Sequence, residues 1–280
     1  LARQYLKDHG GLYFSFRSMD VAFAPRIFIP DCNSWQDFFI EIRNVKNRPV
    51  IFFDDMDDRN DKDIFLEMLP QLAGIAYVVL IYRRKVTLPF ETKNLQMMPL
   101  TPASLRRSNK NLKALDALRI IALTDGIPEL VSQFDLNKDF EENIRSIFSE
   151  GSLYLRYASE ELSREFRSPE SYNTLLYGMA IGHNRISQLA EFSGYPKNKV
   201  DKYLKALDCA GFIETKQRKD DAGQIRTHYY PKGGYLRTWY RLYFPQQNNF
   251  YEPLHNDALS ELLLQIDEHI TKYYFRKCCW

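Results

Sequence analysis

The sequence predicts an α/β domain built on a parallel sheet, followed by a helical subdomain and then by three helices that end in a β-hairpin. Helix and strand patterns alternate over residues 1–100, and two strand patterns, Val50–Phe53 and Ile75–Tyr82, are continuously apolar. Continuous apolar runs are typical of strands covered on both faces, and strands separated by helices form parallel sheets with right-handed crossovers. After Pro99 the strand patterns stop, which predicts the change to helices.

Local signals set the elements of the first domain. A helix over Arg3–His9 is expected to end at Gly10, and the next residues, LYFSF, have a strand pattern. Ser34 is expected to cap the next helix. Its apolar face is predicted to carry Trp35, Phe38, Phe39 and Ile42. Ile64–Leu69 is expected to be helical and to stop at Pro70.

The second half of the chain changes character at about residue 169. Three helix patterns, Tyr172–Ile181, Arg185–Phe192 and Lys197–Cys209, precede two predicted strands, which flank the polar residues Gln217–Arg226. Three helices followed by a hairpin are the order of a winged helix-turn-helix. The predicted domains are therefore residues 1–100, 101–168, 169–232 and an aromatic-rich C-terminal segment at 233–280.

Composition limits the classes of function. The 280 residues carry 38 Lys and Arg against 36 Asp and Glu, a net charge of +2, so any nucleic-acid surface must be local. No apolar run reaches the roughly 18–20 residues of a membrane span, so we expect no membrane partner. The four cysteines form no metal-ligand spacing or disulfide framework, which favours a cytoplasmic protein.

The segment Val50–Asp55 carries the strongest chemical signal. Four apolar residues followed by two carboxylates match the Walker B pattern of P-loop NTPases. Because the end of a buried parallel strand reaches the ligand crevice of an α/β sheet, Asp54 is predicted to be a Mg²⁺ ligand and Asp55 to orient the water that attacks ATP. The alternative is a solvated acidic turn at a helix start. No glycine is followed by lysine, so the chain has no Walker A motif.

A series of phrases resembles a known family. RPVIFFDDMDD, YVVLIYRR, MMPLTPASL, LTDGIPELV, the run from MAIGHNRISQ to CAGFIE, and THYYPKGGYLRTWYRLYFP occur in this order. The set is similar to archaeal-type P-loop ATPases of the STAND/AAA+ group that carry a C-terminal winged helix. The resemblance implies an incomplete P-loop NTPase-like domain. The Walker A motif would lie upstream of Leu1 and a nuclease-like domain would follow Trp280.

The resemblance also implies roles for single residues, and the chain departs from the family pattern at some of them. Arg83, after the strand at residues 75–82, would act as a phosphate sensor or would be an ordinary surface arginine. The family usually has Glu at Asp55, Gly at Asp125 and an aromatic residue at Thr238. It also has Gly-Ser where this chain has Tyr-Arg-Arg. The sequence therefore leaves open whether the chain is an enzyme that hydrolyses ATP.

The predicted winged helix offers a surface for duplex DNA. Lysines spaced three apart lie along one arc of the third helix, and two cations follow on the wing. The candidate DNA-binding residues are Lys199, Lys202, Lys205, Arg218 and Lys219. The alternative is that this domain packs on the ATPase module without touching DNA. The aromatic residues Tyr235, Trp239 and Tyr243 are expected to be core.

Two functions follow from these features. The first is an ATP-binding and ATP-hydrolysing switch in which the winged helix reads out or transmits the nucleotide state. The second is a DNA-binding or scaffolding protein whose ATPase domain is degenerate. The sequence specifies neither a biological process nor an oligomeric state.

Overall fold

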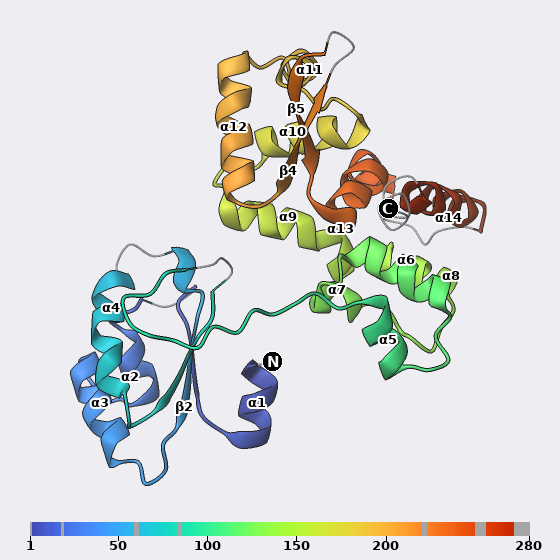
Figure 1. The fold of residues 1–280 in the computed structure, drawn as a ribbon. Coiled ribbons are helices and arrows are strands. Elements are labelled where there is room, and N and C mark those ends of the chain that lie inside the picture. Colours follow the sequence, from blue (N-terminus) through green and yellow to red (C-terminus); the bar gives the residue numbers. More distant parts are fainter. Residues whose placement is uncertain are drawn as a thin grey trace. The chain divides into compact units, whose positions relative to one another are not determined.

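The structure is a computed structural model that describes residues 2–17, 20–58, 62–82, 86–219, 223–249 and 256–271. The chain divides into two compact units, Leu1–Gln96 and Met97–Trp280 (Figure 1). Each unit has a hydrophobic core of its own.

The first unit is built on a parallel sheet, as the sequence predicts. Its strands are β1 (Leu12–Ser15), β2 (Val50–Asp54) and β3 (Tyr77–Leu80), in the order β1-β2-β3. Both neighbouring pairs are parallel. The helices are α1 (Ala2–His9), α2 (Ala24–Phe28), α3 (Trp35–Asn44) and α4 (Lys62–Met68), and short 3-10 turns cover Met56–Asp58 and Leu69–Leu72.

Helices lie on both faces of this sheet. On one face, the ring of Phe53 in β2 lies 5.8 Å from Trp35 in α3 and 4.9 Å from Phe65 in α4. On the other face, the ring of Phe52 lies 5.7 Å from Tyr5 in α1. Ser34 caps α3 through a capping box, and the four apolar residues of the predicted face are all buried, so both predictions are confirmed.

Strand β3 differs from its prediction as a buried strand. Tyr77 and Val79 are 60% and 37% exposed, whereas Val78 and Leu80 pack against the core. The prediction of two covered faces is wrong because α1 packs over Phe52 of the central strand and β3 is an edge strand of the described sheet. An apolar run alone does not say whether both faces of a strand are covered.

The second unit begins with five helices and continues with three helices and a hairpin, in the predicted order. The five are α5 (Pro102–Ser108), α6 (Ala114–Thr124), α7 (Pro128–Val131), α8 (Phe140–Ile147) and α9 (Leu153–Glu165). The next are α10 (Glu170–Ile181), α11 (Ile186–Ser193), α12 (Lys197–Cys209), β4 (Ile213–Lys219) and β5 (Ile225–Pro231). The last are α13 (Gly233–Thr238), a π-helical turn (Trp239–Tyr243), a 3-10 turn (Phe244–Asn249) and α14 (Asn256–Ile270).

The hairpin strands are longer than expected. The polar residues 217–219 and 225–226 belong to the antiparallel ladder of β4 and β5, so the prediction that they form the turn is wrong. Polar side chains suit an exposed ladder because only one face of an antiparallel sheet has to be buried.

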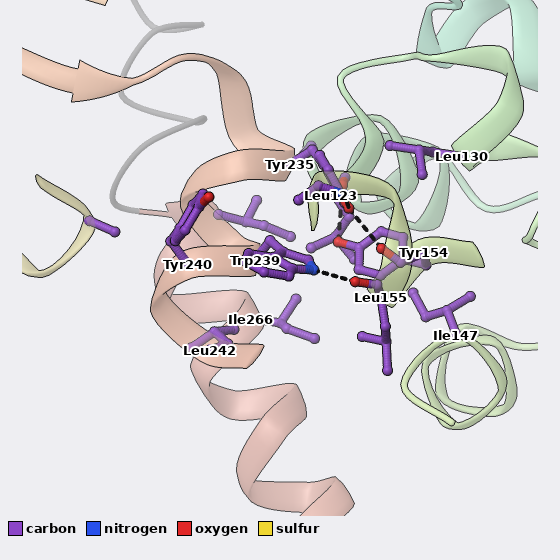
Figure 2. Packing of buried hydrophobic residues seen from close by; sticks show 14 of the residues in the cluster. Leu123, Leu130, Ile147, Tyr154, Leu155, Tyr235, Trp239, Tyr240, Leu242 and Ile266 are labelled. Atoms are coloured by element: carbon purple, nitrogen blue, oxygen red, sulfur yellow. Dashed lines mark hydrogen bonds between the residues drawn. The ribbon is translucent and has the colours of Figure 1, made fainter. Parts of the chain in front are cut away.

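Aromatic side chains from α9, α13 and the π-helical turn form the centre of the second core (Figure 2). The Tyr235 hydroxyl donates to the Tyr154 carbonyl oxygen at 2.7 Å and accepts from the Ala158 amide at 3.0 Å. In a regular α-helix this amide and this carbonyl would hydrogen-bond to each other, so the hydroxyl bridges them. The Trp239 indole donates to the Leu155 carbonyl at 2.7 Å. Tyr235 and Trp239 are buried, which confirms the predicted core role.

The carboxylate of Asp125 joins α6 to α13. Asp125 follows α6 in the left-handed region, with φ +51°, and accepts hydrogen bonds from the backbone amides of Gly234 (2.6 Å) and Tyr235 (3.0 Å). A carboxylate on the first amides of a helix is a charge-assisted cap. Asp125 therefore stabilises a contact between segments that are far apart in sequence.

The segment that connects the two units is exposed. Residues 91–99 have no regular secondary structure, and Leu95 and Met98 are 84% and 70% exposed. We expect a chymotrypsin-type protease to cut first in this segment, because cleavage requires accessible extended chain. Mass spectrometry should detect two stable fragments that meet near Gln96. A first cut inside either core would contradict this expectation.

Candidate functional site

The carboxyl ends of β1 and β2 bring four polar side chains to one edge of the sheet. Ser15 is directly opposite Asp54 in the parallel register, and Tyr13 is opposite Phe52. Side chains alternate between faces along a strand, so Tyr13, Ser15 and Asp54 share the face that α1 partly covers. Asp55 follows β2 directly and is half-buried, like Asp54.

Hydrogen bonds hold both carboxylates at this edge. The Tyr13 hydroxyl donates to Asp54 Oδ2 at 2.5 Å, and the Asp55 amide donates to Asp54 Oδ1 at 2.8 Å. Ser15 Oγ donates to Asp55 Oδ2 at 2.9 Å. The two acids predicted from the sequence are thus side by side and oriented by β1. Neither Tyr13 nor Ser15 is among the predicted site residues, although alternation in LYFSF places both on one face.

Backbone conformation distinguishes Asp55 from an ordinary turn residue. Its φ is +59°, in the left-handed region, which a residue with a Cβ rarely adopts. Such residues cluster at functional sites, where the surrounding structure compensates the strain. The bonds of Asp55 to Ser15 and Asp54 are contacts of this compensating kind.

Tyr82 lies two residues after β3, at this edge of the sheet. Burial, followed by the charge of Asp57, raises the pKa of its hydroxyl. Arg83, the predicted phosphate sensor, lies outside the described residues. Within the described part of the chain, no three His, Cys, Asp or Glu residues are grouped so that they could hold a metal ion.

The lysine arc predicted on α12 has three different environments. Val200, Leu204 and Leu207 are buried. Lys199 Nζ lies 3.9 Å from the centre of the Tyr195 ring, a cation–π contact. Lys205 Nζ pairs with Asp201 at 2.6 Å, and Lys202 is exposed.

The hairpin has two faces that differ in charge. One face carries Ile213 and Tyr229, which pack in or against the core of the second unit. We call the opposite side the outer face. It carries Glu214, Lys216, Arg218, Arg226, His228 and Tyr230. Arg218 and Lys219, predicted together as DNA contacts, are consecutive on β4 and therefore lie on opposite faces.

Comparisons with known proteins give remote matches. No protein-family model matches the chain. The uncharacterized protein MJECL04 of Methanocaldococcus jannaschii is 23% identical over 240 residues, which cover 84% of this chain and 47% of that protein. The chain therefore spans about half the length of this relative. A solved structure of the Aeropyrum pernix ORC1 protein in complex with DNA matches with a TM-score of 0.39 and 11% identity, over 89% of this chain and 81% of that one.

None of the described helices combines the length and the apolar character that crossing a bilayer requires.

Proposed function

We propose that the chain is part of an ATP-binding switch whose nucleotide site lies at the carboxyl edge of the β1-β2-β3 sheet. The observation that carries the proposal is the pair of adjacent carboxylates, Asp54 and Asp55, held at this edge by Tyr13 and Ser15. Ligands of open parallel sheets bind outside the carboxyl ends of the strands. In this proposal Asp54 holds Mg²⁺ and Asp55 orients the attacking water.

The handedness of the sheet supports a further strand next to β3. The connections β1-α3-β2 and β2-α4-β3 cross the sheet in one direction with their helices on one face. Helix α1 lies on the other face. Parallel crossovers are right-handed, so a crossover whose helix lies on the other face runs across the sheet in the other direction. A strand that precedes α1 in the chain and is connected through it to β1 must therefore lie on the β3 side. The first open position there is the free edge of β3, beside the exposed Tyr77 and Val79.

This topology brings the start of α1 to the candidate site. A helix that leads back into a parallel strand runs antiparallel to the sheet, so the N-terminus of α1 lies at the carboxyl edge. Helix N-termini bind phosphate through free amides and the helix dipole. We therefore propose that a phosphate-binding loop precedes Leu1, between the added strand and α1.

The donor set at this edge fits magnesium. Mg²⁺ prefers oxygen ligands and is usually held by one or two carboxylates together with waters and substrate phosphates. Asp54 supplies such a carboxylate, since each of its oxygens accepts one hydrogen bond and keeps a second lone pair. The ion would neutralise phosphate charge, while Asp55 would accept a proton from water.

The test uses the protein extended upstream of Leu1. We expect it to bind ATP·Mg²⁺ in calorimetric titration. Asp55→Asn should lower ATP turnover about 100-fold or more with binding retained, because a water-positioning base acts on the reaction step. Asp54→Asn should also weaken the magnesium-dependent part of binding. Asp57→Asn is the matched control, since Asp57 lies two residues beyond the pair.

Two results would contradict this function. One is an upstream sequence without a Gly-Lys pair, and the other is an extended protein that does not bind ATP. Binding without turnover would favour a degenerate ATPase that senses the nucleotide without hydrolysing it.

A second candidate function is DNA binding by residues 169–232, proposed as a winged helix-turn-helix. The observation that favours it is the cationic outer face of the hairpin, where Arg218 and Arg226 are exposed. Salt-sensitive binding of duplex DNA in the absence of ATP would support this candidate. Unchanged mobility of duplex DNA at low salt would count against it.

A further inference from the structure

The outer face of the hairpin concentrates positive charge in an arrangement that is unfavourable for folding. Arg218 and Arg226 are directly opposite each other in the ladder. Like charges at directly opposite positions destabilise an antiparallel pair. The acid at the base of this face, Glu214, accepts from Arg237 at 2.6 Å and pairs with Lys216 at 2.9 Å.

The histidine on this face reports the local potential. Burial is the main cause that lowers the pKa of His228, and the positive charges of Arg218 and Arg185 lower it further. With Lys216 across the ladder, cations face this ring from β4 and from the start of α11. A bound anion at this face would reverse the electrostatic part of the shift and raise the pKa.

The aromatic side chain on this face is already covered by cations. The Tyr230 ring has Lys216 at 5.3 Å, Arg218 at 5.5 Å and Arg237 at 6.0 Å from its centre. Proteins that bind single strands use open aromatic rings as platforms for bases. A ring covered in this way suits contact with phosphates rather than with unpaired bases.

We propose that the outer face of the β4–β5 hairpin binds the phosphate backbone of duplex DNA, with Arg218 and Arg226 as the principal contacts. This inference rests on the second candidate function and assigns its surface. The arc of lysines on α12 contributes less, because Lys205 is paired with Asp201, whose negative charge offsets that of the lysine. Contacts to phosphate give binding with little sequence preference.

The test compares two double variants with the same change of charge. Arg218→Gln with Arg226→Gln alters the outer face. Lys110→Gln with Lys113→Gln removes the same charge from two exposed lysines before α6, outside both the hairpin and α12. Fluorescence anisotropy with a short duplex, without nucleotide, should show at least about tenfold weaker binding for the first variant at about 50 mM salt. Its slope of log affinity against log salt should fall by about 2, and the control should stay within about twofold of the original protein.

Thermal stability and the pKa of His228 separate binding from structural effects. The outer-face variant should be at least as stable as the original protein, because it removes a repulsive cross-strand pair. NMR titration of the original protein should show that the duplex raises the pKa of His228. Equal loss of binding in both variants, a destabilised outer-face variant or an unmoved pKa would each overturn the proposal. The assay contains no ATP, so its outcome is independent of the nucleotide proposal.

Discussion

Trp239→Ala is expected to lower the free energy of unfolding of the unit at residues 97–280 by about 3–5 kcal/mol, the usual cost of removing a buried tryptophan. Trp239 is buried among Tyr240, Tyr243 and Phe244, with ring centres 4.8 to 5.6 Å away. The substitution leaves a cavity and also leaves the Leu155 carbonyl without the indole donor. Hydrogen exchange of the α9 amides under native conditions measures this loss directly.

The matched control is Trp35→Ala in the other unit. Trp35 is also buried and also donates its indole N–H to a carbonyl, that of Val21, at 2.8 Å. We expect Trp239→Ala to accelerate exchange in α9 and not in β2, and Trp35→Ala to do the opposite. Equal acceleration of both units by either variant would contradict two separate cores.

Gly126→Ala is expected to destabilise the second unit by about 3 kcal/mol or more, from two separate causes. The φ of Gly126 is +69°, where a residue with a Cβ loses about 1–2 kcal/mol. A Cβ would also overlap the carbonyl oxygen of Leu100, whose amide donates to the Gly126 carbonyl at 2.8 Å. The carbonyl oxygen of Leu100 belongs to the backbone and cannot rotate away as a side chain could. The segment before α5 would therefore have to move. Urea denaturation measures the difference.

Gly151→Ala isolates the conformational part of this effect. Gly151 has nearly the same conformation, with φ +74°, but a Cβ there would meet no atom within 4 Å. The variant should therefore lose only the roughly 1–2 kcal/mol of left-handed strain. Equal losses in the two variants would mean that the contact between Gly126 and Leu100 is not tight.

Elements with local signals could be predicted well from the sequence. Ser34 caps α3 as expected, and α12 has its predicted bounds, Lys197–Cys209. Gly182 and Gly194 end α10 and α11 in the left-handed conformation. Caps and C-terminal glycines act within one helical turn, so a short window of sequence contains the whole cause.

Features that depend on distant partners could not be predicted in the same way. The Walker B-like pattern brought attention to Asp54 and Asp55, but their partners Tyr13 and Ser15 lie about 40 residues earlier. The exposure of Tyr77 depends on where α1 packs, which periodicity does not report. The opposite directions of Arg218 and Lys219 follow from the strand extending through both residues.

The bond between Asp125 and Gly234 spans 109 residues, which has a consequence for synthesis on the ribosome. At about 5–20 residues per second, roughly 5–20 seconds pass between translation of the acid and translation of its partner. During this interval the nascent helices α6 to α9 lack the side chains of Tyr235 and Trp239 that fill their shared core. The growing polypeptide therefore exposes apolar surface until Tyr235 and Trp239 emerge, and exposed apolar surface of this kind is prone to aggregate.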